Sequence, residues 1–231
     1  MIIFLHLLYK MSKRLFISPH FADVAFSCGG LIALDPENSL LTVVFSLKPE
    51  KDLLKKYDKY MFETSRKPEK KYLKMFDLTS IDLDFPSAIS RGRTPSNLFS
   101  KELTQMEKDL VFEIRDRLDE IINRYNIKEI YCPKDDRHQI DHHLTKVAVS
   151  KISREVHVFY YKDAPDFLSD EKDKSEEHLE LIKINISKVL DQKIKVVSLY
   201  EDILELFFHS KEKIISKMKQ IPYEVYWKVK D

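Results

Sequence analysis

Two short stretches of this chain combine histidine and aspartate at spacings that suit a metal centre. The first is Ser-Pro-His-Phe-Ala-Asp at positions 18–23, which follows an apolar run and places His20 three residues before Asp23. Imidazole nitrogen and carboxylate oxygen are both ligands that zinc takes in proteins. Taken alone, a His-x-x-Asp pair is equally typical of a helix that begins with an aspartate.

The second stretch strengthens the prediction of a metal site. Positions 131–143 read Tyr-Cys-Pro-Lys-Asp-Asp-Arg-His-Gln-Ile-Asp-His-His, with three histidines and three aspartates between Asp135 and His143. This stretch follows a predicted strand at 129–132 and precedes an amphipathic segment. Because ligands of open α/β sheets bind at the carboxyl ends of strands, the two stretches predict a single shared site.

Further short motifs complete a pattern that runs from Leu15 to the end of the chain. They are Ser18-Pro19-His20 with Cys28-Gly29-Gly30, Lys48-Pro49, Arg66 with Glu69, Asp84-Phe85-Pro86 with Arg91, the segment 159–165, and Pro222 with Glu224 and Trp227. In this order they resemble the PIG-L/LmbE-like zinc-dependent de-N-acetylases. Those enzymes remove acetyl groups from N-acetylglucosamine conjugates and related amino sugars, so the resemblance implies a small-molecule amino-sugar conjugate as partner.

The resemblance also implies roles for five side chains. His20, Asp23 and His142 match the residues that hold Zn²⁺, and three protein ligands leave a coordination position for water. His138 matches a histidine that stabilises the oxyanion or protonates the leaving amine. Asp141 matches a carboxylate that orients the imidazoles.

Arg66 is a further match, and it and the match of His142 both have alternatives. Arg66 matches an arginine that binds sugar hydroxyls or phosphate, but a salt bridge to Glu63 or Glu69 on the same predicted helix would also explain it. His143 could replace His142 as ligand. Because adjacent side chains diverge, only one of these two histidines is expected to face the metal.

The chain departs from the family pattern at two places. Where the family has its general-base aspartate, this chain has Ala22, and a general base contributes roughly 10² to 10⁴ in rate. Asp135, Asp136 or Asp141 could supply the base, Ala22 could be an inactivating substitution, or the chain could bind metal and sugar without hydrolysis. An extra residue between His138 and Asp141 shifts the histidine by up to ~3.3 Å if the chain there is extended.

Alternating strand-like and amphipathic segments predict the elements that must position these residues. The predicted strands are 15–18, 40–46, 80–84, 129–132, 156–161 and 181–186. The predicted helices are 23–34, 51–75, 101–125, 142–153, 188–200 and 203–218. This alternation predicts an α/β fold, a Rossmann-like three-layer sandwich with a mostly parallel sheet flanked by helices, as one domain over 1–231. Residues 1–10 are interpreted either as an extension ahead of a second methionine or as an extra edge element, and 165–180 as a loop.

Composition excludes several other classes of protein. The net charge is +1, from 39 basic and 38 acidic residues, so no nucleic-acid partner is expected. The apolar run at 2–8 is too short to cross a bilayer, and no dinucleotide-binding glycine motif is present. Cys28 and Cys132 are interpreted as buried apolar residues, and a cytoplasmic location is expected. The sequence does not decide whether copies form a homo-oligomer, and a metal-free assembly subunit is the remaining alternative.

Overall fold

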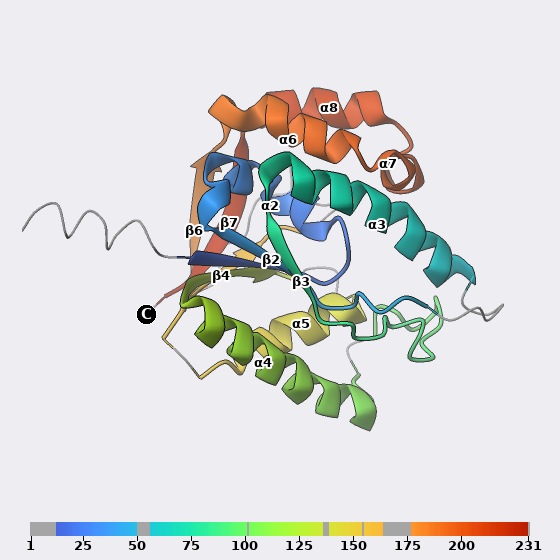
Figure 1. Cartoon of the computed structure of the whole chain (residues 1–231). Helices are drawn as coiled ribbons and strands as arrows, with labels where there is room; N and C mark the ends of the chain where they lie inside the picture. Colours follow the sequence, from blue (N-terminus) through green and yellow to red (C-terminus); the bar gives the residue numbers. More distant parts are fainter. Residues whose placement is uncertain are drawn as a thin grey trace, which may run out of the picture.

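A seven-stranded sheet forms the middle layer of the computed structural model, and helices cover both of its faces (Figure 1). The structure describes residues 13–49, 56–100, 102–135, 139–153, 155–163 and 177–230. The strands are β1 (Lys13–Ser18), β2 (Ser39–Val43), β3 (Thr79–Asp82), β4 (Ile127–Pro133), β5 (His157–Tyr161), β6 (Leu179–Asn185) and β7 (Tyr223–Val229). Their order is β3-β2-β1-β4-β5-β7-β6, in which β1 to β5 are parallel and β7 is antiparallel to both of its neighbours. The predicted three-layer, mostly parallel α/β fold is confirmed.

The helices divide between the two faces of this sheet. They are α2 (Asp23–Leu34), α3 (Lys56–Phe76), α4 (Gln105–Tyr125), α5 (Ile140–Ser150), α6 (Leu190–Ser198), α7 (Glu201–Phe208) and α8 (Lys211–Gln220), with short 3-10 turns η1 (Pro36–Asn38) and η4 (Ser187–Val189). α4 and α5 lie on one face, and the other five lie on the opposite face (Figure 1). Successive side chains of a strand point to opposite faces. Leu15 accordingly belongs to the core cluster that includes Ile114 of α4. Phe16 belongs to the other core cluster, which includes Val196 of α6.

The predicted helix over 203–218 is wrong in one respect, because the chain forms two helices there. His209, at the end of α7, has φ 56°, a left-handed conformation that stops the helix. Ser210 then starts α8, since its side-chain oxygen accepts a hydrogen bond from the Lys213 N–H. A serine cap inside a continuous amphipathic pattern is the signal that the helix prediction overlooked.

β7 was not among the strands predicted from the sequence, although it holds the antiparallel edge of the sheet together. It pairs with β5 and along the whole of β6. Tyr226 and Trp227 of β7 are fully buried. β6 begins at Leu179, so the predicted loop over 165–180 ends slightly earlier than expected, and its residues 165–176 lie outside the described part of the chain.

The sequence also predicted the start of α4, the state of the two cysteines and the nature of residues 1–10. α4 starts at Gln105 because Thr104 forms a capping box with Glu107, later than the predicted start. Cys28 and Cys132 are buried free cysteines, as interpreted from the sequence. The proposed extension at 1–10 lies outside the described residues. Within the described residues, no helix combines the length and the apolar character that a bilayer span requires.

Candidate metal centre and its cavity

The three predicted metal ligands lie together at the carboxyl edge of the sheet. β1 and β4 are parallel neighbours, so the segments that follow them leave the sheet on the same side. His20 and Asp23 come from the turn after β1 and the start of α2, and His142 comes from the first turn of α5. The Asp23 Oδ2 atom is 3.5 Å from His20 Nδ1 and 3.4 Å from His142 Nε2. One ligand atom from each residue lies within 4.8 Å of the other two.

The backbone between β1 and α2 is held in a tight arrangement. The Ser18 hydroxyl donates to the His20 carbonyl at 2.5 Å and accepts from the Val24 N–H at 3.2 Å. The His20 N–H donates to Asp23 Oδ2 at 2.8 Å. Ala22 has φ 88°, a conformation that costs an alanine about 1–3 kcal/mol. This arrangement turns the imidazole and the carboxylate toward the same point.

Glu69 of α3 supports the same turn through a hydrogen bond. Its carboxylate accepts the Ala22 N–H at 3.1 Å and the Tyr200 hydroxyl at 2.5 Å. Burial raises the pKa of Glu69 to about 7, although both hydrogen bonds oppose the increase. The Arg66–Glu69 motif therefore includes a residue that fixes the backbone at Ala22, a role that the sequence analysis did not assign.

Each imidazole of the cluster is backed by a buried aspartate. His20 Nε2 lies 2.8 Å from Asp141 Oδ2, and His142 Nδ1 lies 3.1 Å from Asp163 Oδ1. These contacts leave His20 Nδ1 and His142 Nε2 directed at Asp23. Histidines that bind metals commonly use the second ring nitrogen in this way, which fixes the tautomer and the ring orientation. Asp141 contacts His20, and its orienting role stays a prediction. Asp163 lies in the segment 159–165, for which the sequence predicted no role.

The charges of the cluster explain the protonation of the metal-free site. Burial alone would lower the pKa of His20, but Asp141 and Asp23 raise it to about 9. Burial likewise opposes a charged His142, but Asp23 and Asp163 raise its pKa well above the ordinary value. Burial would raise the pKa of Asp23, but His142 and then His20 hold it below its usual range. A metal ion that binds here must displace protons from the imidazoles.

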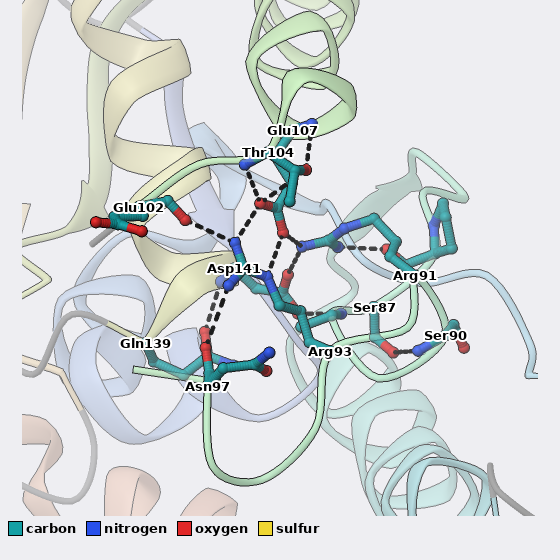
Figure 2. Close-up of polar contacts among 12 residues, drawn as sticks. Ser87, Ser90, Arg91, Arg93, Asn97, Glu102, Thr104, Glu107, Gln139 and Asp141 are labelled. Carbon is teal, nitrogen blue, oxygen red and sulfur yellow. Dashed lines mark hydrogen bonds and ion pairs between the residues drawn. The ribbon is translucent and has the colours of Figure 1, made fainter. Parts of the chain in front are cut away.

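A network of arginines and glutamate continues outward from Asp141 (Figure 2). Asp141 Oδ1 is 2.7 Å from Arg91 Nη2, and Asp141 Oδ2 also accepts the Ala88 N–H at 2.9 Å. Arg91 Nη2 lies 3.5 Å from Glu107 Oε1, and Arg93 pairs with the same carboxylate. Arg91 and Glu107 are both almost fully buried. The loop before α4 and the first turn of α4 therefore fix Asp141, and through it the ring of His20.

A cavity of about 410 Å³ opens onto the cluster. Ala22 and Asp23 both line it, and Ala22 stands at the position where the family pattern has a carboxylate. Asp135 also lines the cavity, its N–H donates to Asp163 Oδ2 at 2.8 Å, and its Oδ2 atom is 2.8 Å from His143 Nδ1. His143 is thus turned to Asp135, while His142 alone joins the metal group.

The other predicted site residues lie apart from the cluster or outside the described residues. Arg66 forms an ion pair of 2.7 Å with Asp82 of β3, and its guanidinium stacks on Phe21 at 4.6 Å. Arg66 does not line the described part of the cavity. His138 and Asp136 lie outside the described residues, so their predicted roles stay predictions.

Solved structures of other proteins share this architecture. No protein-family model and no curated protein matches the chain. Among solved structures, the zinc-inhibited form of the teicoplanin deacetylase Orf2 is similar with a TM-score of 0.77 and 18% identity, covering 94% of this chain and 97% of that one. The N,N'-diacetylchitobiose deacetylase of Pyrococcus horikoshii has a TM-score of 0.56 and 13% identity, covering 94% and 84%. The chain has the fold of these deacetylases.

The predicted resemblance to PIG-L/LmbE-like enzymes is thereby confirmed for the fold. The 4-carboxy-2-hydroxymuconate hydratase GalB of Pseudomonas putida KT2440 is also similar, with a TM-score of 0.51, 15% identity and coverage of 94% and 95%. A hydratase and deacetylases share this architecture, so the fold alone does not determine the reaction.

Proposed function

We propose that this protein is a zinc-dependent hydrolase that removes the N-acetyl group from an N-acetylglucosamine-type conjugate. The observation that supports the proposal is the cluster of His20, Asp23 and His142 at the cavity, with an aspartate behind each imidazole. Two imidazoles and one carboxylate form a donor set typical of catalytic zinc. Zinc held there would supply a Lewis acid that polarises the amide carbonyl and lowers the pKa of water. Two structural neighbours are deacetylases by name, which supports the same reaction class.

Proton transfer in this proposal falls to Asp135, since Ala22 has no proton acceptor. Asp141 is committed to His20, Arg91 and a backbone N–H. Asp135 lines the cavity, as does Asp163, the aspartate behind His142. The contact of Asp135 with His143 would give the proton a route away from the site. Protonation of the leaving amine by His138 remains part of the proposal.

Zinc binding tests the first half of this proposal. The chelator-treated protein should take up one zinc ion, and the same ion should switch on acetate release from N-acetylglucosamine conjugates. Because one neighbour is described in a zinc-inhibited form, the titration should begin well below one equivalent.

His142→Ala should lose both zinc uptake and activity, because it removes one of three ligands. His157→Ala changes an exposed histidine of β5 and serves as the control. Full zinc uptake by His142→Ala would contradict the ligand set.

Replacement of Ala22 tests the second half. Ala22 lines the cavity next to Asp23, so Ala22→Asp should place a carboxylate beside the cluster and raise kcat about 10²-fold or more. Aspartate also tolerates a left-handed backbone better than alanine does. Asp135→Asn should lower kcat by a similar factor, and the double variant Ala22→Asp/Asp135→Asn should recover it. If the double variant stays inactive while Ala22→Asp alone is active, the added carboxylate does not replace Asp135.

The second candidate is a homologue that binds metal or an N-acetylated sugar without hydrolysing it. Ala22 is the observation that favours this alternative. It is supported if the zinc-loaded wild type and Ala22→Asp both release no acetate while the sugar still binds. The cytoplasmic location remains a prediction, to be checked by fractionation, and sedimentation would determine whether copies of the chain form a homo-oligomer.

A further inference from the structure

The cavity beside the metal centre is apolar over most of its described wall. The charged and titratable residues that line it are those of the cluster and the aspartates around it. The remaining wall carries phenylalanines from six segments: the turn after β1, α2, the segment after β2, α3, the loop before α4, and α7. Segments far apart in the sequence thus contribute the same kind of side chain to one enclosed surface.

This apolar wall continues to the surface of the protein. Phe99, Phe207 and Leu47 line the cavity, yet 59%, 48% and 45% of their surfaces are exposed. Large exposed hydrophobic side chains that adjoin a cavity are typical of a ligand-binding surface. They come from three different segments and extend the apolar path from the cluster to solvent.

Several polar groups that could bind a sugar here are already used by the fold. The Ser65 hydroxyl donates to the Met61 carbonyl at 2.7 Å. The Gln139 side-chain oxygen accepts two backbone N–H groups at the start of α5, at 2.8 and 3.1 Å. Arg66, the residue expected to bind hydroxyls, is paired with Asp82. Hydroxyl groups lose free energy when they are buried without hydrogen bonds, whereas hydrocarbon gains it.

We propose that this cavity holds a hydrocarbon group of the substrate, several carbons long, next to the amide that is cleaved. This inference rests on the proposed function, because it states what the amide-bearing molecule carries. The hydrocarbon has two chemical sources. It is either the N-acyl chain itself, longer than acetyl, or an alkyl group on the amine side, such as the aglycone of an N-acetylated sugar.

Two series of compounds distinguish these sources. In the first, glucosamine carries N-acetyl, N-butyryl, N-hexanoyl or N-octanoyl groups, and release of the free amine is measured with the zinc-loaded protein. In the second, N-acetylglucosamine carries methyl, butyl, hexyl or octyl aglycones, and acetate release is measured. In one of the two series kcat/KM should rise about fourfold for each added methylene, from the free energy of burying that group. The series that rises identifies the source.

Binding of the same compounds to metal-free protein separates this inference from the proposed function. Calorimetry should show tighter binding of the octyl or octanoyl compound than of its shortest relative. If affinity rises with chain length but no compound is hydrolysed, the proposed function fails and the hydrocarbon site stands. If hydrolysis occurs but neither rate nor affinity rises with chain length, the hydrocarbon site is overturned and the proposed function stands.

Substitutions of the exposed phenylalanines that line the cavity test whether this cavity causes the dependence on chain length. Phe207→Glu should reduce the advantage of the longest compound over the shortest about tenfold. Phe99→Glu provides a second test in a separate segment should the first variant be unstable. Phe112→Glu changes a phenylalanine of α4 that is 46% exposed and does not line the described cavity, so the chain-length dependence should not change. An equal reduction in Phe112→Glu would overturn the assignment to this cavity.

Discussion

The two histidines of the candidate metal centre contact buried aspartates whose pKa values are shifted in opposite directions. Behind His20, Asp141 lies between the imidazole and the Arg91 guanidinium. Burial would raise the pKa of Asp141, but His20 and Arg91 hold it below its usual range. Behind His142, Asp163 receives the imidazole and the Asp135 N–H, and burial raises its pKa above the usual range.

This difference shows that the same orienting contact can depend on very different amounts of surrounding structure. The His20 side relies on a charged chain that extends through Arg91 to Glu107 in α4. The His142 side relies on two hydrogen bonds to Asp163. We therefore expect substitutions on the His20 side to affect the stability of the whole protein, and substitutions on the His142 side to affect mainly the metal.

The largest effect is expected for Arg91→Met. This substitution removes a guanidinium that is 3% exposed and leaves Asp141 as a buried carboxylate without its arginine. Breaking a buried ion pair typically costs about 3–5 kcal/mol of unfolding free energy. Urea denaturation of the metal-free protein measures this loss without a contribution from bound metal. Arg117→Met, at an exposed position of α4, should cost less than about 1 kcal/mol. A similar small loss for both variants would remove the distinction between the two sides.

The next effect depends on pH and concerns Glu107. Burial would raise its pKa, but Arg93 and Thr104 lower it from 4.5 to about 2. Its contribution to stability is therefore complete above pH 4.5 and is lost as the pH falls toward 2. Glu107→Gln should cost about 2–3 kcal/mol at pH 7, as expected for hydrogen bonds to a charged group. The stability difference from wild type should shrink between pH 5 and pH 3, as expected from the linkage between protonation and folding.

The exposed pair of Arg117 and Glu120 provides the control for this measurement. Glu120→Gln removes a carboxylate that is 73% exposed on the same helix as Glu107. It should change the unfolding free energy little at any of these pH values. A difference between Glu107→Gln and wild type that is the same at pH 7 and pH 3 would show that the Glu107 charge is not what stabilises the network.

The sequence indicated the residues of the cluster better than the residues that hold the cluster in place. Strand and helix periodicity placed β1 and β4, and the rule for strand ends predicted that the segments after them share a site. The family resemblance then singled out His142 within its segment. The pairing of Asp141 with Arg91 could not be predicted in the same way. Arg91 lies in an irregular loop, and its partners are set by tertiary packing rather than by a repeating pattern.

The same limit applied to β7 and to the cavity. The aromatic residues at 223–227 suit a strand, but an antiparallel partner for the last parallel strand depends on where the chain returns. The apolar wall assembles from six segments, each with only one or two of its phenylalanines. No single window of the sequence contains that pattern, so only the folded arrangement shows it.

The direct comparison of the two sides is Asp141→Asn against Asp163→Asn. Loss of an aspartate behind a metal-binding histidine typically weakens metal affinity about 10- to 100-fold, so both variants should bind zinc more weakly. Asp163 already has a raised pKa, and an amide retains its shape. Asp163→Asn should therefore change the unfolding free energy of the metal-free protein by less than about 1 kcal/mol. Asp141→Asn should destabilise it more, because Arg91 keeps its charge in a buried position. Equal losses of stability in the two variants would show that the arginine does not distinguish the two sides.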